Sequence, residues 1–306
     1  MPTTTEPGRL LTAMVTPMRP DGAIDYAQAR RLATALLDSG TQGLVVAGTT
    51  GEAPTISIAE KVRLWGEVKD AVGDRGWVIA GSGDNCTADS IDYSREAVRT
   101  GADALLLTAP YYNKPTQEGL YRHFAAIAGA VDRPCIMYNI PGRTGVNMTA
   151  ETQVRLSREG NILGVKESSA NMAQIAAIIE DAGPAFRIWS GNDEDTFGIM
   201  ALGGYGVISV ATHLVGRQLA DLVRAMTAGE TAPGSIAAAA AIHRRLLPLI
   251  DALFIVTNPI PIKYALNQLG FECGPFRLPM CDPDEATASR IMAEVRRHTI
   301  DLPLPV

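Results

Sequence analysis

The chain has 306 residues, of which 46% are hydrophobic and 20% charged, and its formal net charge is −6 at pH 7. This composition is typical of a globular protein with one large or two medium domains, and without a basic segment it argues against nucleic acid as a partner. No apolar run approaches the ~18 residues of a membrane span, and the first ten residues, MPTTTEPGRL, have no signal-peptide core. We therefore expect a cytoplasmic protein without a membrane partner.

Eight short apolar runs, rich in β-branched residues, divide the first two thirds of the chain. Apolar residues on both faces predict strands of a parallel sheet that is covered on both sides. The runs are residues 10–16, 43–49, 77–82, 104–109, 135–139, 162–166, 187–191 and 206–210.

Helical patterns fill the intervals between these runs. Asp25 and Ser57 precede residues with helical apolar spacing, and Ser57-x-x-Glu60 is a capping box. Asn171 precedes another such helix, and residues 216–226 read as a further one. Eight strand–helix units in about 225 residues predict a (β/α)8 TIM barrel. An open doubly wound sheet is the alternative, but no G-x-G-x-x-G follows the first strand.

After residue 228 the strand pattern stops. The stretches SIAAAAAIHRRLLPLIDALF and DEATASRIMAEVRRHT both have helical composition and spacing. We expect a catalytic barrel in residues 1–228 and, in residues 229–306, a C-terminal helical subdomain of roughly three helices packed on the barrel.

Cysteine and histidine are scattered without the spacing of a metal site. The chain has no C-x-x-C pair, and no two histidines stand at zinc-ligand spacing. Scattered cysteines in a chain of this kind are usually reduced. We therefore expect no metal. The residues are Cys86, Cys135, Cys273, Cys281, His123, His213, His243 and His298.

One predicted strand ends on a lysine. In a barrel, reactive groups gather where the strands end. Within ILGVKESSA, residues 162–170, the apolar run ends on Lys166, although lysine is rarely carried into a core. Neighbouring strand residues point to opposite faces, so Glu167 is not expected to pair with it. A neutral amine in the apolar barrel mouth could form a Schiff base with a ketone. A structural lysine paired with a buried carboxylate is the alternative.

Polar groups end other predicted strands. The hydroxyl of Tyr138 can shuttle protons beside a Schiff base or simply bond a carbonyl. Thr49 and Thr50 lie in AGTTGEAPT, a turn whose N–H groups can hold a carboxylate. Arg143 in NIPGRTG can pair with a substrate carboxylate, unless it is solvated like most loop arginines. The acids of GNDED, residues 191–195, are expected to favour the start of the next helix rather than to bind a metal.

Five motifs occur in the order GTTGE, PYYNKPTQEG, YNIPGRTG, GVKES and TNPIPIK. Together they resemble the dihydrodipicolinate synthase / N-acetylneuraminate lyase family of Schiff-base, pyruvate-dependent enzymes, over nearly the whole chain. The resemblance implies a lyase on a TIM barrel with no metal or organic cofactor. Within the family it favours condensation of pyruvate with L-aspartate 4-semialdehyde to 4-hydroxy-tetrahydrodipicolinate, on the route to diaminopimelate and lysine.

The resemblance also implies the catalytic residues. Lys166 matches the Schiff-base lysine and Tyr138 the proton donor and acceptor. Thr49 and Tyr112 match the partners of that tyrosine in a proton relay. In this family the residue at Tyr112 reaches into the neighbouring subunit's site, which implies a homo-oligomer, usually a homotetramer built as a dimer of dimers.

The substrate-binding residues follow from the same motifs. Thr50 matches the residue that binds the pyruvate carboxylate, and Arg143 the one that meets the carboxylate of the semialdehyde. Gly191 and Ile208 match backbone positions that line the pyruvate end of the site. These assignments are implied by the resemblance and are expectations for this chain.

Regulation by lysine follows the pattern less closely. In family members that lysine inhibits, the allosteric pocket lies at a subunit interface. Asn85 and Tyr111 match its residues, and Asp89 stands where the family has a glutamate. The histidine positions hold Ile58 and Lys61, and the charge of Lys61 would repel a lysine ligand. We expect weak or absent inhibition by lysine.

Two other functions remain open. The first is an aldolase or lyase that cleaves a sialic or 2-keto-3-deoxy sugar acid to pyruvate. Arg143 in GRTG, and Thr49 in place of serine, favour the condensing enzyme, but single substitutions can redirect substrate use within one pocket. The second is a non-catalytic pyruvate-binding protein on the same fold.

Overall fold

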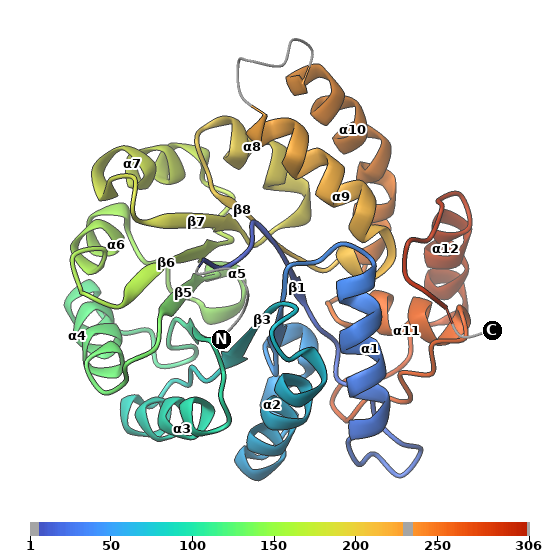
Figure 1. The fold of residues 1–306 in the computed structure, drawn as a ribbon, viewed down its shortest axis with the longest axis horizontal. Coiled ribbons are helices and arrows are strands. Elements are labelled where there is room, and N and C mark those ends of the chain that lie inside the picture. Colours follow the sequence, from blue (N-terminus) through green and yellow to red (C-terminus); the bar gives the residue numbers. More distant parts are fainter. Residues whose placement is uncertain (1–5, 229–234, 305–306) are drawn as a thin grey trace.

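A closed parallel barrel forms the centre of the computed structural model, which describes residues 6–228 and 235–304 (Figure 1). Each strand pairs in parallel with the next along the chain, and the last pairs with the first, which excludes the open doubly wound sheet. The strands are β1 (Leu10–Ala13), β2 (Gly43–Val46), β3 (Trp77–Gly81), β4 (Ala104–Thr108), β5 (Cys135–Asn139), β6 (Ile162–Glu167), β7 (Arg187–Ser190) and β8 (Gly206–Ser209).

Each of the eight predicted apolar runs coincides with one of these strands, and only β6 extends beyond its run, by one residue to Glu167. The predicted TIM barrel is therefore confirmed. Several strands end earlier than the apolar pattern does. The run 43–49 gives a strand only as far as Val46, because Ala47 has a left-handed backbone with φ +55° and turns the chain out of the sheet. The buried residues that follow these strands extend the apolar pattern, but they do not take part in the strand pairing of the sheet.

Helices surround the barrel and begin at the caps that the sequence predicts. The side chains of Asp25, Ser57 and Asn171 accept the backbone N–H three residues on, and Ser57 with Glu60 completes the capping box. The helices are α1 (Tyr26–Asp38), α2 (Ile58–Val72), α3 (Thr87–Arg99), α4 (Gln117–Ala128), α5 (Pro141–Thr144), α6 (Ala150–Leu156), α7 (Met172–Ala182), α8 (Thr196–Ala201) and α9 (Thr212–Thr227), with 3-10 turns η1 (Thr49–Gly51), η2 (Ala53–Thr55) and η3 (Asp193–Asp195).

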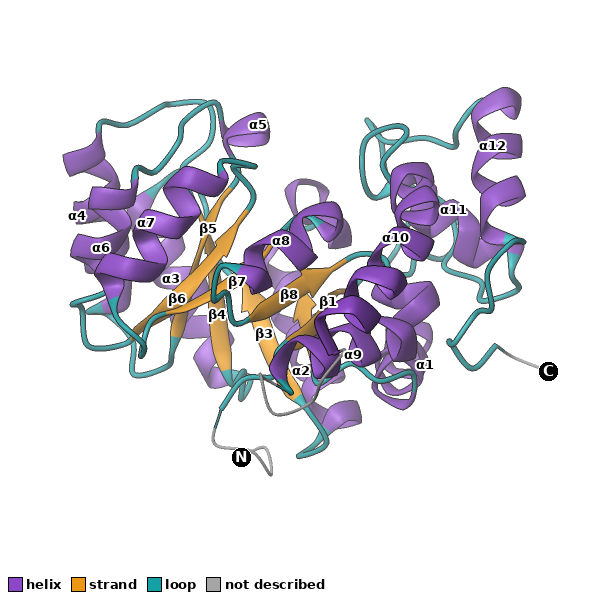
Figure 2. Cartoon of the chain, turned by 90° about the horizontal axis from the view of Figure 1, so that it is seen from above, coloured by secondary structure: helices purple, strands orange, loops and turns teal. Residues whose placement is uncertain are grey.

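Three helices follow in the described part of the C-terminal segment: α10 (Ser235–Leu253), α11 (Ile260–Gln268) and α12 (Glu285–Val295). Helix α10 packs along α9, and Figure 2 shows α11 and α12 gathered at one side of the barrel. The domain boundary predicted between residues 228 and 229 falls at the edge of residues 229–234, which lie outside the described part. None of the described helices is long and apolar enough to span a membrane.

Backbone strain collects in the loops that follow the strands. All the described non-glycine residues with positive φ come after β2, β4 or β6: Ala47, Glu52, Tyr112, Lys114 and Ala170. Such conformations persist only when surrounding contacts hold them, and they concentrate at functional sites. This end of the barrel is therefore the place to examine for chemistry.

Candidate active site

Lys166 and Tyr138 lie side by side at this end of the barrel. They are register partners on β6 and β5, and both side chains are buried, with 5% and 4% of their surface exposed. The ammonium nitrogen of Lys166 lies 4.4 Å from the centre of the Tyr138 ring. A nucleophilic amine and a proton-carrying phenol thus share one buried position.

The carboxylate next to Lys166 faces the other way. Glu167 is fully buried, and its oxygens accept hydrogen bonds from Asn139 Nδ2 at 3.0 Å, Gln153 Nε2 at 2.8 Å and the Ser169 backbone N–H at 2.8 Å. The prediction that Glu167 does not pair with Lys166 is confirmed. Among the described residues Lys166 forms no ion pair, so the structural alternative, a lysine held by a buried carboxylate, is not realised.

Gly191 lies against the lysine side chain. A Cβ at this position would come within 2.9 Å of Lys166 Cε and 2.0 Å of Ser168 Oγ, so no other residue fits without displacement. The Gly191 N–H donates to the carbonyl of Glu167 at 2.8 Å, which fixes the chain beside β6. Ile208 on β8 is fully buried and belongs to the same barrel-interior cluster as Tyr138. Both positions therefore border the lysine end of the barrel.

The two threonines stand in the 3-10 turn η1, directly after β2. Thr50 is buried, and its Oγ1 accepts a hydrogen bond from Asn258 Nδ2 at 2.9 Å. Because the hydroxyl accepts from the amide, its own proton is free to be donated to a carboxylate. Thr49 is half-buried beside it.

Asn258 links this turn to Arg143. The guanidinium of Arg143, which is exposed, donates from one nitrogen to the Asn258 backbone carbonyl at 3.0 Å. Asn258 is itself buried, and among the described residues its Oδ1 meets no donor. The sequence motif TNPIPIK contains this residue, but 208 positions separate it from Thr50, so no local pattern could reveal its role.

A cavity of about 640 Å³ opens among the loops after β2 to β5. Its lining includes Thr49 and Arg143, together with Thr108 and Ile140, and its volume suits a small-molecule ligand. Lys166 and Tyr138 are not among the lining residues. The cavity therefore does not enclose the lysine, and it shares with the predicted site Thr49 and Arg143.

Tyr112 is not brought to the lysine of its own chain. Its side chain is 90% exposed, and its backbone has φ +73°. Its neighbour Tyr111 points inward instead, donating its hydroxyl to Asp84 Oδ2 at 3.1 Å, and burial together with Asp84 raises the pKa of Tyr111 to about 12. Within one chain, the third member of the expected relay is missing.

Only some of the residues that match the family's allosteric pocket for lysine line this cavity. Lys61, Ile58 and Tyr111 line the 640 Å³ cavity, whereas Asn85 and Asp89 do not. Burial lowers the pKa of Lys61, and the Asp84 carboxylate opposes this shift. The ammonium of Lys61 also lies 5.7 Å from the Tyr93 ring centre. The side chain of Lys61 therefore borders the cavity.

The expectation for GNDED is wrong for Asp193. Its carboxylate is buried and accepts the backbone N–H groups of Val210 and Ala211 at 2.9 and 3.1 Å, at the start of α9 rather than of the next helix, α8. Burial raises the pKa of Asp193, while its hydrogen bonds and the charge of Lys166 lower it. The reason is tertiary: β8 ends beside η3, and the N–H groups that follow β8 donate to this carboxylate.

Comparisons with known proteins agree over the whole chain. Residues 6–298 match the dihydrodipicolinate synthetase family. The 4-hydroxy-tetrahydrodipicolinate synthase of Dehalococcoides mccartyi strain CBDB1 is 56% identical over 299 residues, covering 98% of this chain and 99% of that protein.

Solved structures give the same relationship. The DHDPS from Cyanidioschyzon merolae with lysine bound has a TM-score of 0.91 and 41% identity, covering 94% of this chain and 97% of that one. The chloride-inhibited synthase of Acinetobacter baumannii complexed with pyruvate has a TM-score of 0.90 and 35% identity, covering 97% and 99%. The chain therefore belongs to the dihydrodipicolinate synthetase family.

Proposed function

We propose that this protein is a lyase that condenses pyruvate with L-aspartate 4-semialdehyde to 4-hydroxy-tetrahydrodipicolinate, in the biosynthesis of diaminopimelate and lysine. The observation that carries the proposal is a buried lysine that has no ion-pair partner in the described part of the chain and lies against a tyrosine ring at the barrel mouth. Full-length relatives that carry this activity in their names support the choice of substrates.

The first half of the reaction belongs to Lys166 and Tyr138. The neutral amine attacks the ketone carbon of pyruvate, and the Tyr138 hydroxyl protonates the oxygen that departs as water. Thr50 would hold the pyruvate carboxylate, with its hydroxyl proton directed by Asn258. The resulting iminium withdraws electrons, so a methyl proton can leave and an enamine forms.

The second half joins the two substrates. The enamine carbon attacks the aldehyde carbon of the semialdehyde, whose carboxylate Arg143 would bind. The amine of the bound semialdehyde then adds to the iminium carbon and expels the Lys166 nitrogen, which closes the ring. One water is released over the whole reaction, and it leaves in the first half.

We propose that the active unit is a homo-oligomer, a dimer of dimers, in which Tyr112 completes the relay in a neighbouring copy. The support is that Tyr112 is almost fully exposed in its own chain and stands on a strained loop. Mixing a Lys166→Ala protein with a Tyr112→Phe protein tests this. Hybrid assemblies should recover activity that neither variant has alone, and no recovery after subunit exchange would reject a shared site.

Pyruvate consumption tests the reaction itself. The purified protein should consume pyruvate rapidly only when L-aspartate 4-semialdehyde is present. Borohydride with pyruvate should label Lys166, whereas Lys114→Ala, which removes an exposed lysine, should leave the label in place.

The outcomes separate the alternative functions. Labelling of Lys166 without consumption would retain the Schiff base and reject the semialdehyde, and a screen of keto-sugar acids for pyruvate release would follow. Absence of the label would favour a non-catalytic pyruvate-binding protein.

A further inference from the structure

A second buried lysine connects the C-terminal helices to the barrel. The side chain of Lys263, on α11, is fully buried, and its Nζ lies 2.7 Å from Glu52 Oε1 and 2.7 Å from the Pro275 carbonyl oxygen. The Glu52 side chain is 1% exposed. This is an ion pair sealed from water between segments 211 positions apart.

Glu52 is the residue directly after the Thr49–Gly51 turn. Its backbone has φ +59°, a left-handed conformation that is unfavourable for a residue with a side chain, and its N–H donates to the Thr49 carbonyl at 3.1 Å. Its second carboxylate oxygen accepts the backbone N–H of Arg277 at 3.0 Å. Contacts from the C-terminal segment therefore hold the strained residue that ends the turn.

Stability alone is a weak explanation for this pair. Removing two charges from water commonly costs as much as their attraction returns, and apolar residues of similar size often serve equally well. Burial lowers the pKa of Lys263, and the attraction of Glu52 opposes that shift, which shows that the cost applies here. The position of the pair, beside two substrate-facing threonines, suggests that it fixes geometry.

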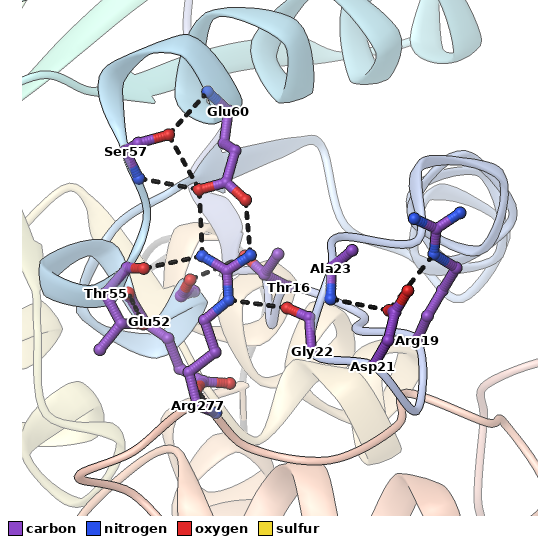
Figure 3. A network of polar contacts seen from close by, with 11 residues as sticks. Thr16, Arg19, Asp21, Gly22, Ala23, Glu52, Thr55, Ser57, Glu60 and Arg277 are labelled. Atoms are coloured by element: carbon purple, nitrogen blue, oxygen red, sulfur yellow. Dashed lines mark hydrogen bonds and ion pairs between the residues drawn. The ribbon is translucent and has the colours of Figure 1, made fainter.

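The same C-terminal segment forms hydrogen bonds with the chain before and after Glu52. The Arg277 side chain donates to the Thr55 and Gly22 carbonyls at 2.7 and 2.8 Å and forms an ion pair with Glu60 at the start of α2 (Figure 3). On the other side, Asn258 donates to the hydroxyl of Thr50. The turn is thus fixed from outside the barrel along its length.

We propose that Glu52 and Lys263 form a positioning pair that sets the Thr49–Thr50 turn for pyruvate binding. The inference rests on the proposed function and adds to it a role for the C-terminal helices. Neither residue of the pair contacts substrate. The pair acts by fixing where the Thr50 hydroxyl and the N–H groups of the turn meet the pyruvate carboxylate.

The test compares stability with pyruvate binding in three variants: Glu52→Gln, Lys263→Met and the double variant. Each single variant leaves one buried charge unpaired and should melt at a lower temperature. The double variant removes both charges and should regain most of the melting temperature. Its KM for pyruvate, and the pyruvate concentration that half-saturates borohydride trapping, should stay raised about tenfold, because the turn has lost its anchor.

A second ion pair serves as a matched control. Lys69 and Asp103, 2.9 Å apart and largely buried, join α2 to the chain before β4, away from the turn. Lys69→Met should lower the melting temperature and leave the KM for pyruvate unchanged. If the neutral Glu52 variants do not fold, Glu52→Asp is the variant to test. It keeps the negative charge but is one methylene shorter, so the turn must shift for the ion pair to form. This shift should still raise the KM for pyruvate.

The outcomes distinguish the two proposals. A double variant with wild-type melting and wild-type pyruvate dependence would overturn the positioning role. If only Glu52→Asp folds, an unchanged KM for pyruvate in that variant would also overturn the positioning role. Failure of pyruvate to support trapping in the wild-type protein would instead reject the proposed function.

Discussion

Lys166 and Lys263 are both buried lysines, and their surroundings differ in one respect. Lys263 meets a carboxylate at 2.7 Å, whereas Lys166 meets the ring of Tyr138, and its neighbour Glu167 faces away. The carboxylate of Glu52 occupies the amine of Lys263, whereas no carboxylate forms an ion pair with the amine of Lys166 among the described residues. Burial alone therefore does not identify a catalytic lysine, and the partner of the amine separates the reactive one from the structural one.

The most severe test of this contrast removes Lys166. Lys166→Ala should lower kcat by roughly four orders of magnitude, because the nucleophile is lost. The melting temperature should fall only modestly, because no ion pair between described residues is broken, although a cavity forms and buried Asp193 loses a favourable nearby charge. The measurement is steady-state pyruvate consumption with a parallel melting curve. Substantial residual turnover would show that another amine carries the reaction.

A smaller disturbance of the same lysine comes from Gly191→Ala. The added Cβ would lie 2.9 Å from Lys166 Cε and must displace it. A displacement of about 1 Å can cost about a hundredfold in rate, so kcat should fall by that order. Gly66→Ala on α2, where a Cβ meets nothing within 4 Å, is the matched control and should keep full activity. Equal rates in the two variants would mean that Lys166 tolerates movement.

Substitutions of Asn258 test how the site holds the pyruvate carboxylate. Asn258→Ala leaves the Thr50 hydroxyl undirected and should raise the KM for pyruvate about tenfold. Asn258→Asp adds a negative charge beside the expected substrate carboxylate and should raise it further. Isothermal titration of pyruvate, with catalysis blocked by omitting semialdehyde, gives the two affinities. The reverse order would place the carboxylate elsewhere.

Lys61 is a third buried lysine, and its substitution tests whether its charge repels a free lysine ligand. Lysine should bind weakly or not at all to the wild-type protein, since Lys61 borders the cavity. Lys61→Ala should strengthen lysine binding severalfold in the same calorimetric titration. Inhibition of the wild-type protein by sub-millimolar lysine would contradict the expectation.

The smallest effect is a difference in acid stability between buried histidines that form no ion pair in the described structure and an ion-paired carboxylate. Burial lowers the pKa of His123 and of His213 to about 4, so unfolding releases imidazoles that bind protons more readily, and stability should fall between about pH 6.5 and pH 4. The hydrogen bond from Arg277 lowers the pKa of Glu60 to about 2, so its contribution is present above about pH 4.5 and lost toward pH 2. Melting temperatures over this range should show a shallower first decline in His123→Leu and a shallower second one in Glu60→Gln.

Local patterns predicted much of this molecule. The eight strands follow from apolar runs, and the caps at Asp25, Ser57 and Asn171 follow from side chains that reach their own backbone. Lys166 could be singled out because a lysine at the end of an apolar run is unusual. These features depend on residues within a few positions of one another, which is the range over which sequence periodicity carries information.

The contacts that fix the site geometry were beyond such patterns. Glu52, Lys263 and Asn258 all lie in motifs that the sequence singles out. Their contacts nevertheless join residues 258–263 to residues 50–52, which are more than 200 positions apart. The contacts of Asp193 were mispredicted for the same reason, since its partners Val210 and Ala211 lie between β8 and α9. The proposed role of Tyr112 requires a second chain, which one sequence does not describe.

The separation of Glu52 from Lys263 has a consequence for the newly made protein. A ribosome adding about 5–20 residues per second completes Lys263 roughly 10–40 s after Glu52. The eight strands end at Ser209, so all of them are made before the lysine exists. A nascent barrel can therefore close with its Thr49–Thr50 turn still unanchored, and the ability to bind substrate would arrive last, with the emergence of the C-terminal helices.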